Sequence, residues 1–411
     1  MSFSEWKEST LNDIADITMG QSPKGEFCNN NGEGVPLLNG PTEFGEHHPY
    51  PTQFTVDVKK WARKGDILFC VRGSTTGRMN WADRDYAIGR GIAAISPKHD
   101  NTDRFIKCFI EIKLPELLKM ATGSTFPNVS RNMLIDLCKQ VPEYGEMIRI
   151  NNFIRSIEDK IDTNNQINKN IEEMAQAIFK QWFVDFDFPN ENGELYKSSG
   201  GELVESEFGM IPRGWNVIEL EEVAKNITRG MTPKYEDISS IKVLNQKVNK
   251  GKILEKQYFK YLKEDSVIPD EKYAYQWDIL LNSLGQGTLG RVHLYKEITT
   301  DVVVDQHISI IRCKNPGWAF YIYNLLDSSK YQTILEGLFS GSTGMLMLNI
   351  SKVRALKIVK PSESLINKFE EVLICLYNKI EINNCISEKL GLIRESLLPK
   401  LMSGEIGVPL E

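Results

Sequence analysis

Residues 150–182, INNFIRSIEDKIDTNNQINKNIEEMAQAIFKQW, form a stretch in which apolar residues and two asparagines recur at alternating spacings of four and three. The stretch contains neither proline nor glycine. This seven-residue repeat is typical of a long helix whose apolar side faces another helix. The repeating positions are Ile150, Ile154, Ile157, Ile161, Asn164, Asn168, Ile171, Ala175, Ile178 and Trp182.

A second stretch repeats this pattern at a constant offset of 219 residues, counted from Asn164 to Asn383. It contains no glycine or proline before Gly391 and Pro399. Each helix could pack on its own domain, or the two could pack on each other as a coiled coil. We favour the coiled coil because both helices keep the same frame. The repeating positions are Leu373, Leu376, Ile380, Asn383, Ser387, Leu390, Arg394, Leu397 and Leu401.

The predicted seam between the helices has a polar centre. Asn164 and Asn383 occupy equivalent positions, each near the middle of its helix. In an antiparallel pair the two middles meet, so these two side chains would pair. A buried asparagine pair lowers stability but fixes the register of the helices.

The sequence before each helix is also repeated, at a spacing of roughly 210–220 residues. The matches occur in the same order in both halves, and chance does not explain an ordered series. We expect one scaffold that is used twice with different surfaces. The matched pairs are Trp6 and Trp215, Leu11 and Leu220, Ala15 and Ala224, Gly20 and Gly230, Asn39 and Asn245, Asp66 and Asp278, and Arg78 and Arg291.

Each repeat has the pattern of an α+β domain. Short β-rich runs such as 66–72 and 307–312 lie between glycine-rich turns, and helical patterns follow at 104–120 and 319–338. The fold expected is therefore α+β, with an internal repeat of two similar domains, each followed by a long helix. The predicted boundaries are 1–145 for the first domain, 146–183 for the central helix, 184–214 for an irregular exposed linker, 215–361 for the second domain, and 362–411 for the last helix and tail.

The composition is that of a globular protein of two or three domains, with 411 residues of which 41% are hydrophobic and 25% charged. No apolar run approaches the ~20 residues of a membrane span, and the first residues lack the apolar segment of a signal peptide. Seven scattered cysteines without a C-x-x-C pair suggest neither a zinc ribbon nor disulfides. We therefore expect a cytoplasmic protein without a membrane partner. The net charge of −6 neither supports nor excludes nucleic acid, so any such contact must be local.

Several kinds of catalytic site are missing from the sequence. Residues 315–318 (NPGW) resemble half of the target-base loop of a DNA methyltransferase, but the second proline and a preceding glycine-rich turn are absent. Gly251-Lys252 is followed by Ile253, so there is no P-loop. The five histidines have no metal-ligand spacing. We expect no catalytic residue, no metal and no cofactor on this chain.

Nucleic-acid contacts are predicted at a glycine-rich segment that recurs in both repeats. It is RGSTTGR at 72–78 and GQGTLGR at 285–291. Hydroxyl and backbone N–H groups bond phosphates, and Arg or Gln recognises base edges. The alternative is a plain turn with a solvated arginine, but its recurrence at the same place favours a DNA role.

The second repeat adds a basic stretch, QKVNKGK at 246–252, where the first repeat has the neutral residues 39–42. It suits a phosphate-tracking surface, and a solvated charged face is nearly as good an interpretation. The loops 123–125 and 341–343 are further paired candidates, for structure or for phosphate contact. The residues that we predict to bind DNA are Asn39, Arg72, Ser74, Thr75, Thr76, Arg78, Arg90, Gln246, Lys247, Lys250, Lys252, Gln286, Thr288 and Arg291.

The layout resembles the specificity subunit of type I restriction–modification systems over nearly the whole chain. The resemblance rests on the repeated landmarks together with IFKQWFVDF at 178–186, IPRGW at 211–215 and SLLPKLMSGEI at 396–406. It implies two target-recognition domains, each recognising half of a split double-stranded DNA site in the major groove. It also implies that the two long helices form an antiparallel coiled coil that separates these domains, with the pseudo-twofold symmetry of the internal repeat. The helices would bind methyltransferase subunits, two in number.

The same resemblance implies that ATP-driven restriction subunits join the complex. S-adenosylmethionine, ATP and Mg²⁺ would be held by those partner subunits, and adenine methylation would be their chemistry. An alternative with the same layout is the recognition subunit of another, fused restriction–methylation enzyme, which the neighbouring genes would distinguish. An enzyme with an unrecognised site and a pure coiled-coil assembly protein fit less well, since no carboxylate–lysine cluster is visible and an assembly protein needs no large α+β domains.

Overall fold

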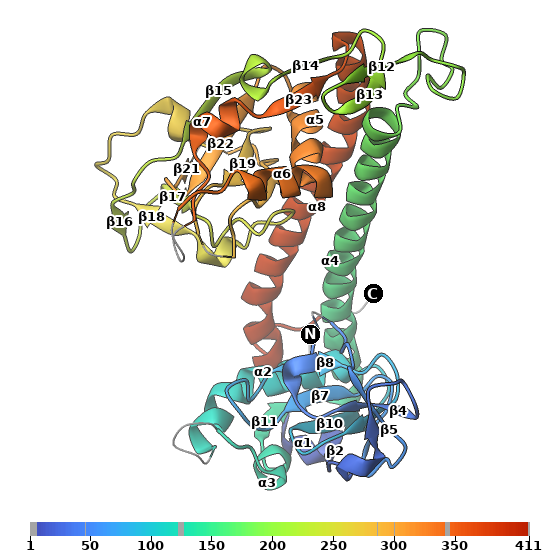
Figure 1. Cartoon of the computed structure of the whole chain (residues 1–411). Helices are drawn as coiled ribbons and strands as arrows, with labels where there is room; N and C mark the ends of the chain where they lie inside the picture. The colour runs from blue at the N-terminus through green and yellow to red at the C-terminus, as the bar shows by residue number, and fades with distance from the viewer. Residues whose placement is uncertain are drawn as a thin grey trace. The chain divides into compact units, whose positions relative to one another are not determined.

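The computed structural model describes residues 6–45, 47–121, 127–285, 287–299, 301–341 and 346–409. It divides into two compact units, one of residues 1–163 with 386–411 and one of residues 164–385. The long helices α4 (Tyr144–Phe179) and α8 (Glu363–Ser403) each contribute one part to each unit (Figure 1). We call residues 6–141 domain 1 and residues 216–360 domain 2.

Domain 1 is built on two sheets. The first is antiparallel, in the order β2 (Ala15–Met19), β10 (Ile92–Pro97), β7 (Ile67–Cys70), β8 (Met79–Trp81). The second has the order β3 (Cys28–Asn29), β5 (Gln53–Thr55), β4 (Val35–Leu38), β9 (Tyr86–Ile88), β6 (Trp61–Ala62), with β4 and β9 parallel. A further pair joins β1 (Lys7–Thr10) to β11 (Cys138–Val141).

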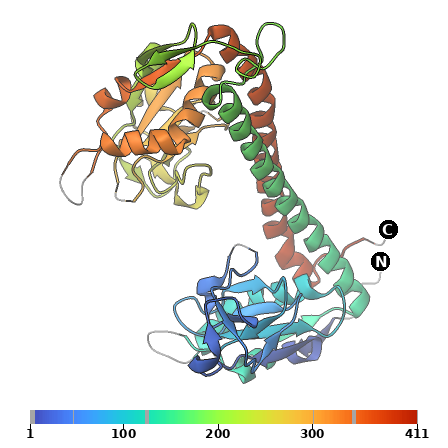
Figure 2. The ribbon, with the colours of Figure 1, turned by 45° about the vertical axis from the view of Figure 1, so that its right-hand side comes forward.

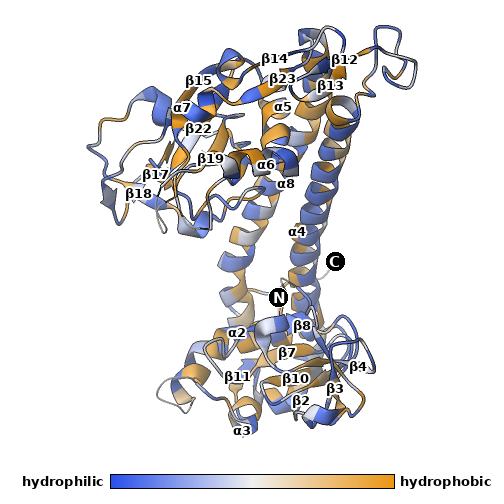
Figure 3. Ribbon diagram, in the orientation of Figure 1, coloured by the Kyte–Doolittle hydropathy of each residue, from blue (hydrophilic) through white to orange (hydrophobic). Residues whose placement is uncertain are grey.

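Strand β7 separates two cores of domain 1. Successive side chains of a strand point to opposite faces. Ile67 and Phe69 accordingly lie in the core beneath the helices α1 (Leu11–Ile14), α2 (Asp103–Met120) and α3 (Arg131–Ile135), whereas Leu68 lies in the core towards the second sheet. All four β7 side chains are fully buried, as expected for a strand covered on both faces. Figure 3 colours the ribbon by hydropathy, and the strands of this sheet include hydrophobic segments in orange.

Domain 2 repeats this plan in the same order. Its first sheet is β15 (Ala224–Arg229), β22 (Ile308–Cys313), β19 (Ile279–Asn282), β20 (Val292–Leu294), and its second is β16 (Tyr235–Glu236), β18 (Lys260–Leu262), β17 (Lys242–Leu244), β21 (Val302–Val304). Strand β14 (Asn216–Glu219) pairs with β23 (Lys357–Lys360), and β17 is parallel to β21. The helices are α5 (Pro316–Asp327), α6 (Ser329–Gly337) and α7 (Ile350–Arg354). The predicted helix at 319–338 is thus broken at Ser328, whose hydroxyl caps α6 by accepting from Tyr331 N.

The predicted linker has more structure than an irregular, exposed connection. It contains the hairpin β12 (Leu203–Ser206) and β13 (Gly209–Pro212). The Phe188 ring stacks on Trp215 with 5.3 Å between centroids, and Ile211 is buried in the same core. Aromatic and aliphatic side chains therefore pack this segment into unit 2. Its amino-acid composition alone had indicated a solvent-exposed linker.

The two long helices run antiparallel within each unit. In unit 1 the beginning of α4 shares a core with the end of α8, through Ile154, Leu401 and Met402. In unit 2 the end of α4 shares a core with the beginning of α8, and Phe179 lies 6.5 Å from Phe369 between ring centroids. Figure 2 shows α4 in green beside α8 in red. The prediction of two similar α+β domains with an antiparallel helix pair is confirmed.

The predicted seam positions all lie at least partly inside the structure. Ten of them are buried: Ile150, Ile154, Ile157, Asn164, Ile171, Ala175, Leu373, Ile380, Asn383 and Leu401. The remaining nine are partly exposed: Ile161, Asn168, Ile178, Trp182, Leu376, Ser387, Leu390, Arg394 and Leu397.

Candidate DNA interface

The turn between β7 and β8 contains two side chains that hold the structure together. The Arg78 guanidinium donates to Phe44 O at 2.8 Å and lies 5.9 Å above the Phe44 ring. The same guanidinium also donates to the carbonyl oxygens of Pro41 and Gly45, each at 3.4 Å. The Thr76 hydroxyl donates to Gly73 O at 2.8 Å. Arg78 and Thr76 therefore fix neighbouring backbone.

Three other predicted residues of this turn are exposed. Arg72 and Ser74 have no side-chain hydrogen bond or ion pair with any of the residues that the structure describes, and Thr75 has a weak contact of 3.9 Å to Cys70 Sγ. Gly73 has a positive φ of 98°, which a residue with a side chain rarely adopts. The turn thus presents one arginine and two hydroxyls on a backbone that requires glycine.

The matching turn of domain 2 is closed differently. Arg291 donates to Gly287 O at 2.9 Å, within its own turn, and the Thr288 hydroxyl donates to Gly285 O at 3.3 Å. Gln286 lies outside the described residues, as do the loop residues 123–125 and 342–343. The two arginines that align in sequence therefore stabilise different backbone segments.

Ser22 contacts both Asn39 and the backbone of Arg90 at a second exposed place in domain 1. Asn39 Nδ2 donates to Gln53 Oε1 at 2.9 Å, and the Ser22 hydroxyl contacts Asn39 Oδ1 at 3.5 Å. Ser22 Oγ also accepts from the backbone N of Arg90 at 3.2 Å. This group, which we call the β10 turn cluster of domain 1, comprises Ser22, Asn39, Gln53 and Arg90.

The equivalent place in domain 2 is a cavity of about 360 Å³. Asp305 is buried beside it, where its carboxylate accepts from Tyr235 OH at 3.0 Å and from His307 N at 2.8 Å and also contacts His307 Nδ1. The residues that line the cavity are Tyr235, Asn245, Gln246, Lys247, Gln257, Tyr258, Phe259, Lys260, Asp305 and His307.

The basic stretch of domain 2 is only partly free. Lys250 pairs with Glu255 at 3.3 Å and lies 5.2 Å from the Tyr258 ring. Lys247 lines the cavity, and neither it nor Lys252 has an ion-pair partner in the described part of the chain. Gln246 faces the same cavity. Lys247 and Lys252 are thus the lysines of this stretch that remain available to a phosphate.

Sequence reasoning did not single out Tyr235, Asp305 or His307. No motif marks them, because they come from two segments that only the fold brings together. The matched glycines Gly20 and Gly230 carry the usable signal, since each packs against the turn that precedes β10 or β22.

A family model described as type I restriction modification DNA specificity domain matches residues 3–173. The HindI specificity subunit of Haemophilus influenzae is 25% identical over 85% of this chain and 88% of its own length. The MjaIX specificity subunit of Methanocaldococcus jannaschii is 25% identical over 98% of this chain and 94% of its own. This chain belongs to the type I restriction–modification specificity subunits.

The fold of this specificity subunit agrees with the same family. The type I S subunit of M. genitalium has a TM-score of 0.63 at 16% identity and covers 98% of this chain and 97% of its own. That likeness concerns the fold. Among the described residues, no group of three or more His, Cys, Asp or Glu is placed to hold a metal ion. In that same part of the chain, no helix is both long enough and apolar enough to cross a membrane.

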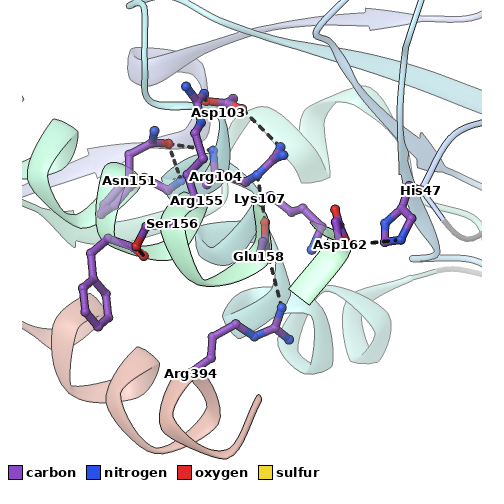
Figure 4. Close-up of polar contacts among 12 residues, drawn as sticks. His47, Asp103, Arg104, Lys107, Asn151, Arg155, Ser156, Glu158, Asp162 and Arg394 are labelled. Atoms are coloured by element: carbon purple, nitrogen blue, oxygen red, sulfur yellow. Dashed lines mark hydrogen bonds and ion pairs between the residues drawn. The ribbon is translucent and has the colours of Figure 1, made fainter. Parts of the chain in front are cut away.

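Polar contacts attach domain 1 of the specificity subunit to its helices (Figure 4). Asn151 Oδ1, on α4, accepts from the backbone N of Arg104 and Phe105 at 2.8 and 3.1 Å, and so caps α2. Glu158 pairs with Arg104 at 2.8 Å and with Arg394 of α8 at 3.0 Å. Asn151 is buried and the two ion pairs are partly buried, so these contacts are less screened by solvent than fully exposed surface pairs are.

Further contacts extend the attachment along α4. The Arg155 guanidinium donates to Asp103 at 2.6 Å, and His47 Nε2 lies 3.3 Å from Asp162 Oδ1. Figure 4 shows these side chains reaching from the helix to the domain. Domain 1 is therefore held by contacts spread over several turns of one helix.

Domain 2 is attached by a buried ion pair. Lys296 Nζ lies 3.0 Å from Glu172 of α4 and 5.3 Å from the Tyr377 ring of α8. Gln176 donates to Asp327 at 3.4 Å, and burial raises the pKa of the Asp327 carboxyl. On α8, Glu370 accepts from Gly317 N at 2.9 Å, at the start of α5.

The helix seam has a polar centre in unit 2. Asn164 Nδ2 donates to the backbone carbonyl of Asn383 at 3.4 Å. Asn383 Nδ2 donates to Asn168 Oδ1 at 2.8 Å, and Asn168 Nδ2 donates to Asn384 Oδ1 at 2.8 Å. The amides therefore form a chain of hydrogen bonds across the seam, in which Asn168 takes part as well as the predicted Asn164 and Asn383.

Proposed function

We propose that this specificity subunit binds a DNA site of two separated halves, with domain 1 on one half and domain 2 on the other. The observation that carries the proposal is that each domain exposes polar side chains without partners among the described residues, although on different segments of the repeated scaffold. Arg72 and Ser74 offer such groups in domain 1, and Lys247 and Lys252 offer charge in domain 2. Side chains of these kinds bond phosphates and base edges, so they suit the major groove.

The chain would recognise the DNA sequence, while partner subunits would catalyse the reactions. Two methyltransferase subunits would dock on the helices and methylate adenine, and restriction subunits would join them. S-adenosylmethionine, ATP and Mg²⁺ would be bound by those partners. Helix α8 exposes Ile382, Leu392 and Ile393, at 53%, 62% and 44%, and such exposed apolar side chains favour a protein partner.

A cytoplasmic site of action fits the cysteines of this chain. All seven are free thiols, which suits a reducing compartment. Two of them, Cys375 and Cys385, are exposed on α8.

The experiment is to co-express this chain with the methyltransferase subunit of its own system and to sequence the host DNA for modified adenines. The expected result is a single motif of two short specified halves around a fixed unspecified gap. Exchanging residues 1–145 for the equivalent part of a relative with another motif should change one half only.

Either of two results would contradict the proposal. One is the absence of any new motif when both proteins are soluble and associated. The other is a motif that is continuous, or that changes in both halves after the exchange. A chain that does not associate with the methyltransferase would count against the partner assignment alone.

A further inference from the structure

The turns that precede β10 and β22 are built in the same way in the two domains. Gly89 N donates to Leu38 O at 2.8 Å, and Asp305 N donates to Leu244 O at 3.0 Å. On the other side of each turn, Val71 N donates to Gly91 O at 2.9 Å and Ser283 N donates to His307 O at 2.8 Å. These matched bonds place Arg90 and Gln306 at the same position of the scaffold, between the second sheet and the first.

The backbone of each turn is held in close contact with a glycine. A Cβ on Gly20 would lie 2.1 Å from Gly89 O, and a Cβ on Gly230 would lie 2.2 Å from Val304 O. No side chain fits at such distances. In domain 2, Asp305 adds bonds from Tyr235 and from the next residues of the turn. A side chain on either turn therefore projects from rigid backbone, as a base-recognising group requires.

A hydroxyl occupies the same place beside each turn but acts on a different atom. In domain 1, Ser22 Oγ accepts from the backbone N of Arg90, and the described residues offer no partner to the exposed guanidinium. In domain 2, the Thr232 hydroxyl donates to Gln306 Oε1 at 2.7 Å. The described residues offer no bond to Gln306 Nε2. Thr232 thus orients the amide and leaves its donor nitrogen available.

The two side chains differ in what they recognise. An arginine donates two bonds to O6 and N7 of guanine, whereas a glutamine donates to N7 and accepts from N6 of adenine. Gln306 Oε1 has a second lone pair, so the bond from Thr232 leaves it able to accept from adenine. The backbone bonds of the turn are the same in both domains, whereas the side chain between them differs in the base that it can recognise.

We infer that Arg90 and Gln306 are equivalent specificity-determining residues. Arg90 contacts a guanine in the half-site bound by domain 1, and Gln306 contacts an adenine in the half-site bound by domain 2. This inference rests on the proposed function, because it assigns one base contact to each domain.

The test uses the full chain in complex with its methyltransferase and compares methylated motifs of Arg90→Gln and Gln306→Arg variants with the wild type. Arg90→Gln is expected to replace one guanine of the domain 1 half by adenine, or to leave that position unspecified, with the other half unchanged. Gln306→Arg is expected to replace one adenine of the domain 2 half by guanine, or to leave that position unspecified, with the domain 1 half unchanged. Arg84→Gln is the control, since Arg84 is an exposed arginine of domain 1 that pairs with Asp83.

A binding measurement keeps the inference testable if a variant methylates too little DNA. Replacing the assigned guanine by 7-deazaguanine removes the N7 acceptor. The wild-type complex should then bind the duplex more weakly, on the order of tenfold. The Arg90→Ala complex, which has no side-chain donor at this position, should bind the two duplexes equally, and thermal unfolding of the variants should match the wild type.

The inference is overturned if the wild type methylates a split motif but both substitutions leave it unchanged. A domain 1 half without guanine, or a 7-deazaguanine effect that persists in Arg90→Ala, would also overturn it. If the wild type itself gives no split motif, the proposed function fails, and that outcome is distinct from the others.

Discussion

Asn151 and Glu370 make the same kind of contact at equivalent positions of the two long helices. Asn151 Oδ1 accepts from the first amides of α2, and Glu370 Oε2 accepts from Gly317 N at the start of α5. The two residues are separated by the constant offset that relates the helices. Each long helix therefore supplies an acceptor for amides at the start of the main helix of the domain that precedes it in the chain.

These caps should contribute measurably to stability. Asn151→Ala leaves the amides of Arg104 and Phe105 without an acceptor, and we expect the free energy of unfolding to fall by about 1–2 kcal/mol. Glu370→Ala should have a similar effect on unit 2. Urea unfolding of the full chain measures both, with the exposed Asn165→Ala on α4 as control. A cap substitution that costs no more than the control would refute this role.

The asparagines of the seam should act as a coupled pair. Asn383→Leu leaves Asn168 without its donor and should lower the free energy of unfolding by about 1–2 kcal/mol. Adding Asn168→Leu should recover much of this loss, because both partners are then apolar. A double-mutant cycle in urea should give a coupling of about 0.5–3 kcal/mol. Additive effects of the two substitutions would show that the bond does not couple them.

Substitutions of Arg78 and Arg72, which lie on the same turn, should affect different properties: the first the stability of the chain, the second its DNA binding. Arg78→Ala removes the bond to Phe44 O and should lower the thermal stability of the chain, by about 1–3 kcal/mol in free energy. Arg72→Ala should leave thermal unfolding unchanged and weaken DNA binding. Paired measurements of thermal unfolding and of duplex binding check both. The interpretation fails if Arg72→Ala destabilises the chain as much as Arg78→Ala does.

His293 should make unit 2 sensitive to acid. Burial, with Lys296 nearby, lowers its pKa from 6.5 to about 3. Between these values the unfolded chain binds a proton that the folded chain does not, so folding is less favourable as the pH falls below about 6.5. From pH 7 to pH 5 the wild type should lose about 2 kcal/mol more than His293→Gln. Urea unfolding at both pH values tests this, and parallel losses would contradict it.

The helices and the repeat could be predicted because they depend on local periodicity. The seven-residue frame of Ile154 and Leu373 marks the seam without knowledge of any other segment. The break at Ser328 was not predicted, since its capping bond does not interrupt the apolar pattern of 319–338. The linker was misjudged because Phe188 and Ile211 become buried only through distant partners such as Trp215.

The candidate interface was less predictable than the fold. Arg78 and Arg291 look alike in sequence, but only the fold shows that one holds the backbone at Phe44 and the other its own turn. Gln306 was not predicted to bind DNA because it differs in residue type from Arg90, its structural equivalent. Contacts between segments far apart in the chain decide which polar groups remain free, and periodicity carries no information about them.

The last turn of α8 has a consequence for how the chain is made. Leu401 and Met402 are buried in the core of unit 1, together with Phe105 and Ile154. Domain 1 emerges from the ribosome long before these two residues are synthesised. The nascent domain therefore exposes part of its core throughout the synthesis of domain 2. Contacts between segments so distant in sequence form slowly. Truncation just before Leu397 should therefore impair domain 1, although it removes only residues that follow domain 2 in the chain.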